Sequence, residues 1–338
     1  MRKTAGILAA VAIAASALIA APAHADTPTI TSGGSSFSAG IMSTCAANYT
    51  DAKVTYTASS SGTGRTNYMS GTFNFAGSDG AFGSTEKQPA ASDFRYIPVV
   101  GGPIAIVYNL AGVPSLRLDA ATIGKIFLGQ IKTWNDPAIA ALNPSAKLPA
   151  SAITPQYRSD KSGTNGNFAG YLSKNTTGWV NDQTWTIATK QTTPAGNGNS
   201  GSSAVVQSLK STVGSIGYVD LKDAVSGGLK VAAVKNAAGQ FLLPSAAAAS
   251  KFLANMPVAA NGFVTIDWAK PVPGGYNASL ITYAIVNTGA KTANGAATKS
   301  FIQYVLNTCV PANAAKLGYV ALSGGQATKA KALALLIK

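Results

Sequence analysis

Short apolar segments rich in β-branched residues recur along the chain and predict buried strands. They lie at 53–58, 73–79, 95–109, 214–221 and 279–287. Such segments, bounded by Gly, Pro, Asn or Ser, are typical of strands. The long run at 95–109 is broken at Gly101-Gly102-Pro103, so we expect separate strands there that are buried on both faces.

Segments with helical spacing lie between these strands. Apolar residues share one face at 120–129, where Gly129 is placed to end the helix. Asp136 followed by Pro137 is a strong signal for a helix start, and 300–309 predicts an amphipathic helix. The alternation of strands and helices predicts an α/β fold with mainly parallel sheets.

Residues 1–25 predict a cleavable export signal. Two basic residues precede an Ala-rich apolar run that is too short for a membrane span, and Ala23 and Ala25 suit cleavage before Asp26. No Cys follows that run, so a lipid anchor is not indicated. No later stretch reaches the roughly 18 apolar residues that a spanning helix needs. We therefore expect a soluble periplasmic or secreted protein.

Removal of this signal would leave a chain without imidazole, because the single His is His24. Ser-His-Asp and Cys-His catalysis are then excluded, and so are His-ligated metal sites. We expect no metal and no cofactor.

The chain is basic, with 26 Lys and Arg against 12 Asp and Glu. Without Arg2 and Lys3 the balance is 24 against 12, a net charge of +12. Such a charge favours anionic partners in general. The Lys residues are dispersed rather than gathered in runs with aromatic residues, so we expect no nucleic acid partner.

Two cysteines remain in the mature chain, Cys45 and Cys309. In an exported protein such a pair favours a disulfide over two buried thiols, and this one would tie the N-terminal and C-terminal segments together. About 310 residues remain after residue 25, which is more than one core comfortably accommodates, so two domains are expected.

Small hydroxyl-bearing turns follow predicted strands and precede helical segments at three places. They lie at 35–37, 61–64 and 162–164. The third turn belongs to the stretch YRSDKSGTNGNF, in which Arg158 and Asp160 precede it, and Asp79 follows the strand at 73–79. Helix N-termini offer free backbone N–H groups and positive potential, and strand carboxyl ends are where open α/β sheets bind ligands. Each turn alone also suits an ordinary loop, but together they favour an oxyanion site.

These motifs resemble those of the periplasmic phosphate-binding protein of ABC-type phosphate importers. The matching stretches are GGSSF, SDGAF, IFLGQIKTWNDPAIAALNP, RSDKSGT, GSIGYVDL and LGYVAL. The resemblance covers most of the mature chain, and the third stretch is the most specific.

The resemblance implies a type II periplasmic-binding-protein fold, in which two α/β domains are joined by two crossover segments. The crossovers would lie near 101–106 and 275–280. Domain I would then comprise 26–104 plus 277–338, with both termini and both cysteines, and domain II would comprise 105–276. The implied function is to bind phosphate and deliver it to an ABC permease in the inner membrane, without enzymatic activity and as a monomer.

The resemblance also assigns the ligand residues. The expected phosphate contacts are Ser36, Phe37, Ser61, Asp79, Arg158, Ser162, Gly163 and Thr164, and Asp160 would hold Arg158 in position. In the second turn, TASSSGTG differs from the usual pattern, so Ser60 remains an alternative to Ser61. The Gly-rich segment at 196–209 lacks charged residues that are common there in the family. The resemblance therefore assigns no ligand or supporting contact to this segment.

Asp79 would be the only acceptor in this site. A carboxylate beside an oxyanion is repulsive unless a proton lies between them, and phosphate carries that proton at neutral pH whereas sulfate does not. A site that pairs a buried polar group with a hydrogen-bonding group of its ligand can reject an analogue lacking that group by a factor of roughly 10⁴–10⁵. This expectation opposes a sulfate or molybdate receptor.

Two other functions remain as alternatives. One is a secreted phosphate-binding or polyanion-binding protein that acts at a surface or matrix without a permease, attracted by the positive charge. The other is a phosphatase-like hydrolase, which would need a Ser nucleophile without an obvious base.

Overall fold

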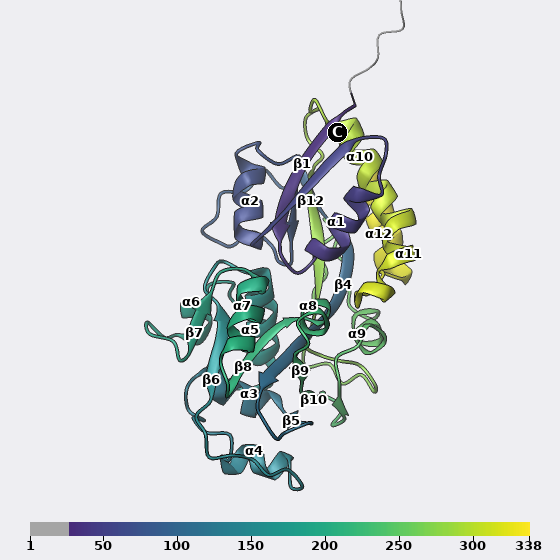
Figure 1. The fold of residues 1–338 in the computed structure, drawn as a ribbon. Helices are drawn as coiled ribbons and strands as arrows, with labels where there is room; N and C mark the ends of the chain where they lie inside the picture. Colours follow the sequence, from purple (N-terminus) through teal and green to yellow (C-terminus); the bar gives the residue numbers. More distant parts are fainter. Residues whose placement is uncertain (1–26) are drawn as a thin grey trace, which may run out of the picture.

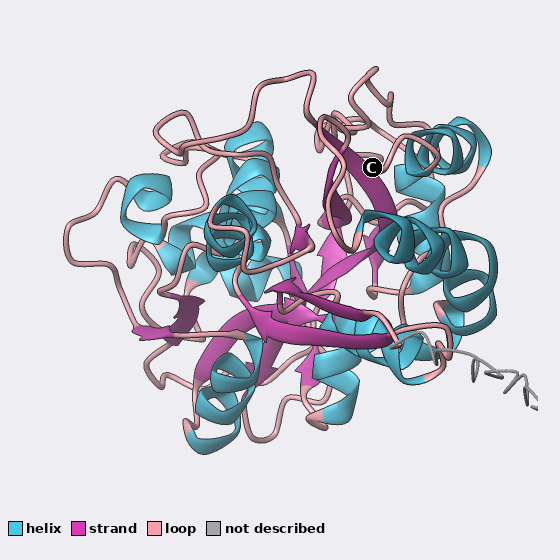
Figure 2. Cartoon of the chain, turned by 90° about the horizontal axis from the view of Figure 1, so that it is seen from above, coloured by secondary structure: helices cyan, strands magenta, loops and turns pink. Residues whose placement is uncertain are grey.

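The computed structural model describes residues 27–338, so the predicted export signal lies outside the described residues. The chain forms two lobes that lie one above the other in Figure 1. The first lobe contains β1–β3, β12, α1, α2 and α10–α12, and the second contains β5–β8 and α3–α8. Figure 2 shows helices on both sides of the strands, as in a layered α/β fold.

One long strand connects the two lobes. The nine-stranded sheet runs in the order β2-β1-β3-β12-β4-β8-β6-β7, with β9 also paired to β4. Its strands are β1 (Thr29–Ser35), β2 (Lys53–Ser59), β3 (Phe75–Ser78), β4 (Phe94–Asn109), β6 (Thr154–Arg158), β7 (Asn197–Asn199), β8 (Ser215–Asp220), β9 (Lys230–Val231) and β12 (Ser279–Asn287). A small three-stranded sheet contains β5 (Arg117–Leu118), β10 (Ala233–Lys235) and β11 (Phe241–Leu242).

The prediction of mainly parallel sheets was only half correct. The outer strands of each lobe are parallel, namely β2-β1-β3 in the first lobe and β8-β6-β7 in the second. The pairs β3–β12, β12–β4 and β4–β8 between them are antiparallel. The reason is that β4 and β12 carry the chain between the lobes in opposite directions.

The predicted break at Gly101-Gly102-Pro103 was also wrong, because β4 is one strand across it. Its first part pairs with β12 up to Pro103, and its last part pairs with β8 from Ile104 onward. Pro103 has no N–H to donate, and it lies where β4 changes partner, so the ladder tolerates it. Near this point, Gly101 also exchanges two backbone hydrogen bonds with Val320, at 2.9 and 2.7 Å.

The helices predicted at 120–129 and after Asp136 are present with their expected signals. Gly129 follows the first of them in a left-handed conformation, with φ of 69°. The Asp136 side chain accepts from the N–H of Ala138 at 2.9 Å, as a helix cap. The helices are α1 (Ala39–Ala47), α2 (Ser61–Met69), α3 (Ala120–Phe127), α4 (Pro137–Leu142), α5 (Gly163–Asn175), α6 (Trp185–Thr189), α7 (Ser202–Ser211), α8 (Leu221–Ser226), α9 (Ala246–Leu253), α10 (Gly295–Tyr304), α11 (Val310–Asn313) and α12 (Gly324–Ala334).

The helix predicted at 300–309 is not a single α-helix. α10 ends at Tyr304, and a π-helical turn follows over Val305–Cys309 before α11. Pro311, which cannot donate an N–H and crowds the carbonyl four residues earlier, explains the wider turn.

The disulfide between Cys45 and Cys309 is confirmed. It joins α1 to the π-helical turn with a Cα–Cα distance of 5.6 Å, and both cysteines are buried. The bond therefore fastens two segments of the first lobe that are 264 residues apart. Within residues 27–338, no helix is long and apolar enough to cross a membrane.

Candidate functional site

The polar turns predicted from the sequence meet where the two lobes face each other. In the first lobe, β1, β2 and β3 are parallel, so their carboxyl ends lie at one edge, with Ser35 paired to Ser59. In the second lobe, β6 ends at Arg158 and leads to the start of α5. These strand ends are the edges at which open α/β sheets bind ligands.

Asp79 follows β3 directly and is the buried carboxylate of this region. Its side chain is 3 % exposed. The hydroxyls of Ser35 and Thr282 donate to its Oδ1 at 2.5 and 2.6 Å. The Ser61 hydroxyl lies 3.5 Å from its Oδ2, so this second oxygen is the less engaged of the two.

The pKa of Asp79 lies above its ordinary value. Burial raises it, while the hydrogen bonds from Ser35 and Thr282 and the charge of Arg158 lower it and offset part of the effect. The charge of this carboxylate is therefore only partly compensated by the groups around it.

The start of α5 lies against Asp79. Ser162 caps this helix, its hydroxyl accepting from the N–H of Asn165 at 3.3 Å. The first N–H groups of a helix have no partner inside the helix, so those of Gly163 and Thr164 are available. Gly163 has no space for a side chain, because an added Cβ would lie 2.7 Å from the Cβ of Asp79. The structure thus brings Asp79, Ser162, Gly163 and Thr164 together.

Arg158 and Asp160 form the charged part of the site. The Nε of Arg158 donates to Oδ1 of Asp160 at 2.6 Å, and its second terminal nitrogen contacts the other carboxylate oxygen. The Arg158 side chain is 2 % exposed, and that of Asp160 is 19 % exposed. This two-pronged contact holds the guanidinium in one orientation.

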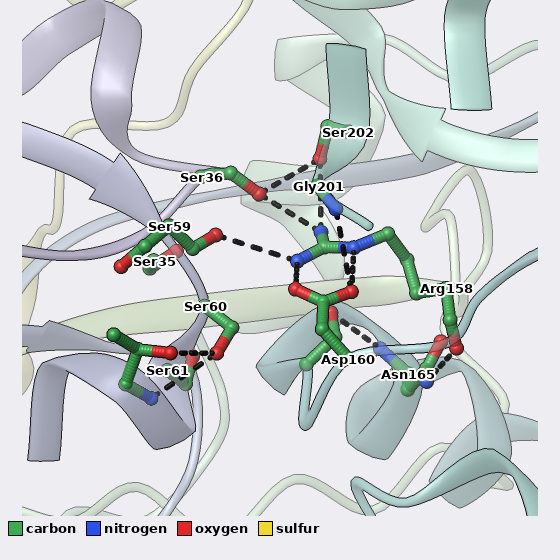
Figure 3. A network of polar contacts seen from close by, with 12 residues as sticks. Ser35, Ser36, Ser59, Ser60, Ser61, Arg158, Asp160, Asn165, Gly201 and Ser202 are labelled. Atoms are coloured by element: carbon green, nitrogen blue, oxygen red, sulfur yellow. Dashed lines mark hydrogen bonds and ion pairs between the residues drawn. The ribbon is translucent and has the colours of Figure 1, made fainter. Parts of the chain in front are cut away.

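The remaining donors of Arg158 contact Ser36 and Ser59 of the first lobe and Ser202 of the second, as Figure 3 shows. One terminal nitrogen donates to the Ser36 hydroxyl at 2.8 Å and to the Ser202 hydroxyl at 3.1 Å. The other donates to the carbonyl of Ser59 at 3.4 Å. The structure therefore places Ser36 and Arg158, which come from different lobes, in direct contact.

Sequence reasoning missed several residues of this network. Ser202 begins α7 and lies 2.9 Å from the Ser36 hydroxyl, and the N–H of Gly201 donates to Asp160 at 3.4 Å. Both belong to the Gly-rich segment to which we assigned no contact. Thr282, a partner of Asp79, was also missed, because a hydroxyl inside a buried strand gives no separate signal in one sequence. Ser35, the other partner, belongs to the predicted turn at 35–37 but was not assigned a role.

Ser60 and Ser61 have different roles. Ser60 caps α2, its hydroxyl accepting from the N–H of Thr63 at 3.1 Å. The Ser61 hydroxyl accepts from the N–H of Asp79 at 3.1 Å. The geometry brings Ser61, not Ser60, to Asp79.

Phe37 is buried beside the site. Its ring packs edge-on against Tyr319 at 5.7 Å, and its carbonyl accepts from the Tyr319 hydroxyl at 2.7 Å. These contacts fix the turn between β1 and α1, so the N–H groups of that turn keep one direction.

A cavity of about 820 Å³ is lined by Asp79 and by residues of both lobes. Its walls include Gly80, Lys161, Gln183 and Trp268. Within the described part of the chain, no group of three His, Cys, Asp or Glu side chains is arranged to hold a metal ion.

Known proteins with similar sequences agree with this architecture. Residues 20–308 match the family model described as a PBP superfamily domain. The chain is 36 % identical over 266 residues to phosphate-binding protein PstS 2 of Mycobacterium tuberculosis, covering 73 % of this chain and 70 % of that one. It is 38 % identical over 224 residues to phosphate-binding protein PstS of Pasteurella multocida, covering 64 % of each chain.

Solved structures share the fold. A high-affinity periplasmic phosphate-binding protein, PfluDING, solved with bound phosphate, superposes with a TM-score of 0.72 and 22 % identity, covering 90 % of this chain and 93 % of that one. A phosphate-binding protein from Stenotrophomonas maltophilia gives a TM-score of 0.70 at 21 % identity, with the same coverage. The predicted two-domain periplasmic-binding-protein fold is thereby confirmed. The chain belongs to the PBP superfamily and, within it, to the family of PstS phosphate-binding proteins.

Proposed function

We propose that this chain is an exported solute-binding protein that binds one inorganic phosphate between its lobes and delivers it to an ABC-type importer. The names of its relatives support the ligand class. The proposed contacts are those expected from the sequence: Ser36, Phe37, Ser61, Asp79, Arg158, Ser162, Gly163 and Thr164, with Asp160 positioning Arg158.

One observation carries this proposal, namely a buried carboxylate among groups that suit an anion. Oδ1 of Asp79 is engaged by two hydroxyls, so Oδ2 is the atom that would accept a hydrogen bond from the ligand. A protonated phosphate oxygen donates that hydrogen bond and keeps its proton. Fully ionised sulfate would instead leave two negative charges facing each other in a buried site, which is costly.

The positive groups around the ligand balance its charge. The second lobe supplies the fixed guanidinium of Arg158 and the first N–H groups of α5, and the first lobe supplies the Ser36 hydroxyl, which lies 2.8 Å from a terminal nitrogen of Arg158. Because these groups come from both lobes, a phosphate between them would hold the lobes together.

The proposed domain division follows the strands that cross between the lobes. Domain I is 26–104 plus 277–338, and domain II is 105–276. The change of partner in β4 between Pro103 and Ile104 supports the first boundary. The hydrogen bond from the N–H of Ile104 to the carbonyl of Ala278, at 2.7 Å, supports the second, because it joins residues next to the two proposed boundaries.

The site would bind its ligand without chemical change, as a periplasmic or secreted monomer. The Ser61 hydroxyl accepts from a backbone N–H, and the chain beyond residue 24 contains no His to activate a nucleophile. The proposal therefore includes an ABC permease as the partner and no enzymatic activity.

Calorimetric titration of the phosphate-stripped protein tests the proposal. We expect one phosphate to bind per chain and sulfate to give no heat of binding. No heat of binding with either anion would overturn the proposal and favour a protein that acts on polyanions at a surface.

A further inference from the structure

A second polar network joins the lobes outside the proposed phosphate site. It consists of Arg65 and Glu86 from the first lobe and Lys161 and Gln183 from the second, and we call these four residues the clasp. Arg65 is buried in α2, with 1 % of its side chain exposed. Its guanidinium contacts both carboxylate oxygens of Glu86, at 2.7 and 2.9 Å.

This Arg65–Glu86 pair is held firmly within the first lobe. The N–H of Gly83 donates to Glu86 at 2.8 Å, and Arg65 donates to the Ser78 hydroxyl at 2.9 Å. Burial alone would raise the pKa of Glu86, but the hydrogen bonds from Arg65 and Lys161 outweigh it and hold the pKa at about 2. Glu86 is therefore a fixed negative charge on the wall that faces the second lobe.

The second lobe contacts this pair through two side chains. The Nζ of Lys161 lies 2.7 Å from Oε1 of Glu86. Arg65 donates to Oε1 of Gln183 at 2.9 Å, and the Gln183 amide donates to the carbonyl of Ala81 at 3.2 Å. These three contacts cross between the lobes, so separation of the lobes would break them while leaving Arg65 paired with Glu86.

The second-lobe residues of the clasp flank the turn that starts α5. Lys161 directly precedes Ser162, and the N–H of Ser162 donates to the carbonyl of Gln183 at 3.3 Å. The carbonyl of Lys161 accepts from the N–H of Gly62 in the first lobe, at 3.0 Å. The clasp therefore acts on the turn that bears Ser162, Gly163 and Thr164.

We infer that Glu86 and Lys161 are positioning residues that favour the closed form and thereby set how tightly and how long the anion is held. This inference rests on the proposed phosphate function for its ligand, but not for the closure itself. A ligand that binds between two lobes gains affinity when the closed form is more populated beforehand. The clasp contributes to closure without touching the ligand.

Variants with opposite charge changes test the inference. Lys161→Met removes the ammonium and keeps most of the apolar stem, whereas Glu86→Gln removes the carboxylate charge and keeps an oxygen for Arg65. If Lys161 and Glu86 acted only by attracting or repelling the anion, phosphate would bind more weakly to Lys161→Met and more tightly to Glu86→Gln. The clasp predicts weaker binding in both, by about threefold to tenfold, with faster dissociation.

Lys174→Met is the matched control. Lys174 lines the same cavity, and no ion pair to it is found within residues 27–338. We expect this variant to bind and release phosphate as the unmodified protein does, and Lys161→Arg to restore most of the affinity. Equal affinities and dissociation rates in the unmodified protein, Lys161→Met and Lys174→Met would overturn the inference, and so would tighter binding by Glu86→Gln.

Small-angle scattering separates the clasp from the phosphate proposal. Without ligand and at low salt, Lys161→Met should have a larger radius of gyration than the unmodified protein, and high salt should reduce the difference. If the unmodified protein binds no phosphate, the proposed function fails, yet this comparison still tests closure. Identical radii at all salt concentrations would overturn the clasp.

Discussion

Thr282 and Asp79 are 203 residues apart in sequence, yet the Thr282 hydroxyl donates to Oδ1 of Asp79 at 2.6 Å. Thr282 lies in β12, the strand that pairs with both β3 and β4, and β3 ends next to it. The contact fixes Oδ1 of the carboxylate, whereas Oδ2, the proposed ligand contact, has only the Ser61 hydroxyl at 3.5 Å. The selectivity of the proposed site therefore depends on the sheet itself, not only on its loops.

Replacing Asp79 by Asn tests the role of its free oxygen. Asn keeps a carbonyl oxygen for Ser35 and Thr282 but presents an amide donor in place of Oδ2. We expect phosphate affinity to fall by about tenfold to a hundredfold, since a hydrogen bond to a charged group is lost, and sulfate to become a ligand because the repulsion is gone. Titration of the variant with both anions measures this. Continued rejection of sulfate by a variant that still binds phosphate would contradict the assignment.

Gly163→Ala tests whether the lobes must close tightly. The added methyl group would lie 2.7 Å from the Cβ of Asp79, so α5 could not approach the first lobe as it does here. We expect the phosphate affinity to fall at least tenfold, since the closed form is disfavoured, while the melting temperature of the ligand-free protein changes little. Gly325→Ala is the control, because no atom lies within 4 Å of an added Cβ there. Equal phosphate affinities in the two variants would show that closure does not depend on this contact.

The disulfide is expected to stabilise the protein without affecting its ligand. Replacing both Cys45 and Cys309 by Ala should lower the free energy of unfolding by about 2–5 kcal/mol, because the bond closes a very long loop. Thermal melts check this, and the phosphate affinity well below the melting temperature should stay the same. An unchanged melting temperature would mean that the packing of α1 on α10–α11 suffices alone.

The acid sensitivity of the protein is expected to depend partly on Glu86. Its pKa in the folded protein is about 2, lowered from 4.5, so the folded state binds this proton less readily than the unfolded chain. The resulting stability is present above about pH 4.5 and is lost as the pH falls toward 2. Glu86→Gln should therefore lose less stability than the unmodified protein between about pH 5 and pH 3, as urea unfolding can measure. An equal loss in both proteins would contradict the assignment, and the exposed Asp51→Asn serves as the control.

Much of the fold could be predicted from local patterns. The strands at β2, β3, β8 and β12 and the starts of α3 and α4 depend on short-range rules, namely alternation of apolar residues, β-branched content and helix caps. The continuity of β4 could not be predicted, because it depends on partners far away in sequence. Pro103 is tolerated because it lies opposite Ser279, the first residue of β12, and the next residue, Ile104, already pairs with Asp220, the last residue of β8.

The site could be predicted where its residues form compact motifs. Arg158, Asp160 and the 162–164 turn are adjacent in sequence, and the structure brings the turn to Asp79 and Ser61 and Arg158 to Ser36. Ser202 could not be found in this way, because its segment lacks the charges that the family pattern has and its contact with Ser36 depends on how the lobes meet. The clasp likewise joins Arg65 to Gln183, 118 residues further along the chain.

The most direct test of the central claim is a crystal structure of the protein with phosphate, at a resolution that separates the ligand oxygens. We predict one phosphate between the lobes, with one oxygen within hydrogen-bond distance of Oδ2 of Asp79 and others near Arg158 and the N–H groups of Gly163 and Thr164. A phosphate bound elsewhere, or one bound here without contact to Asp79, would contradict the account.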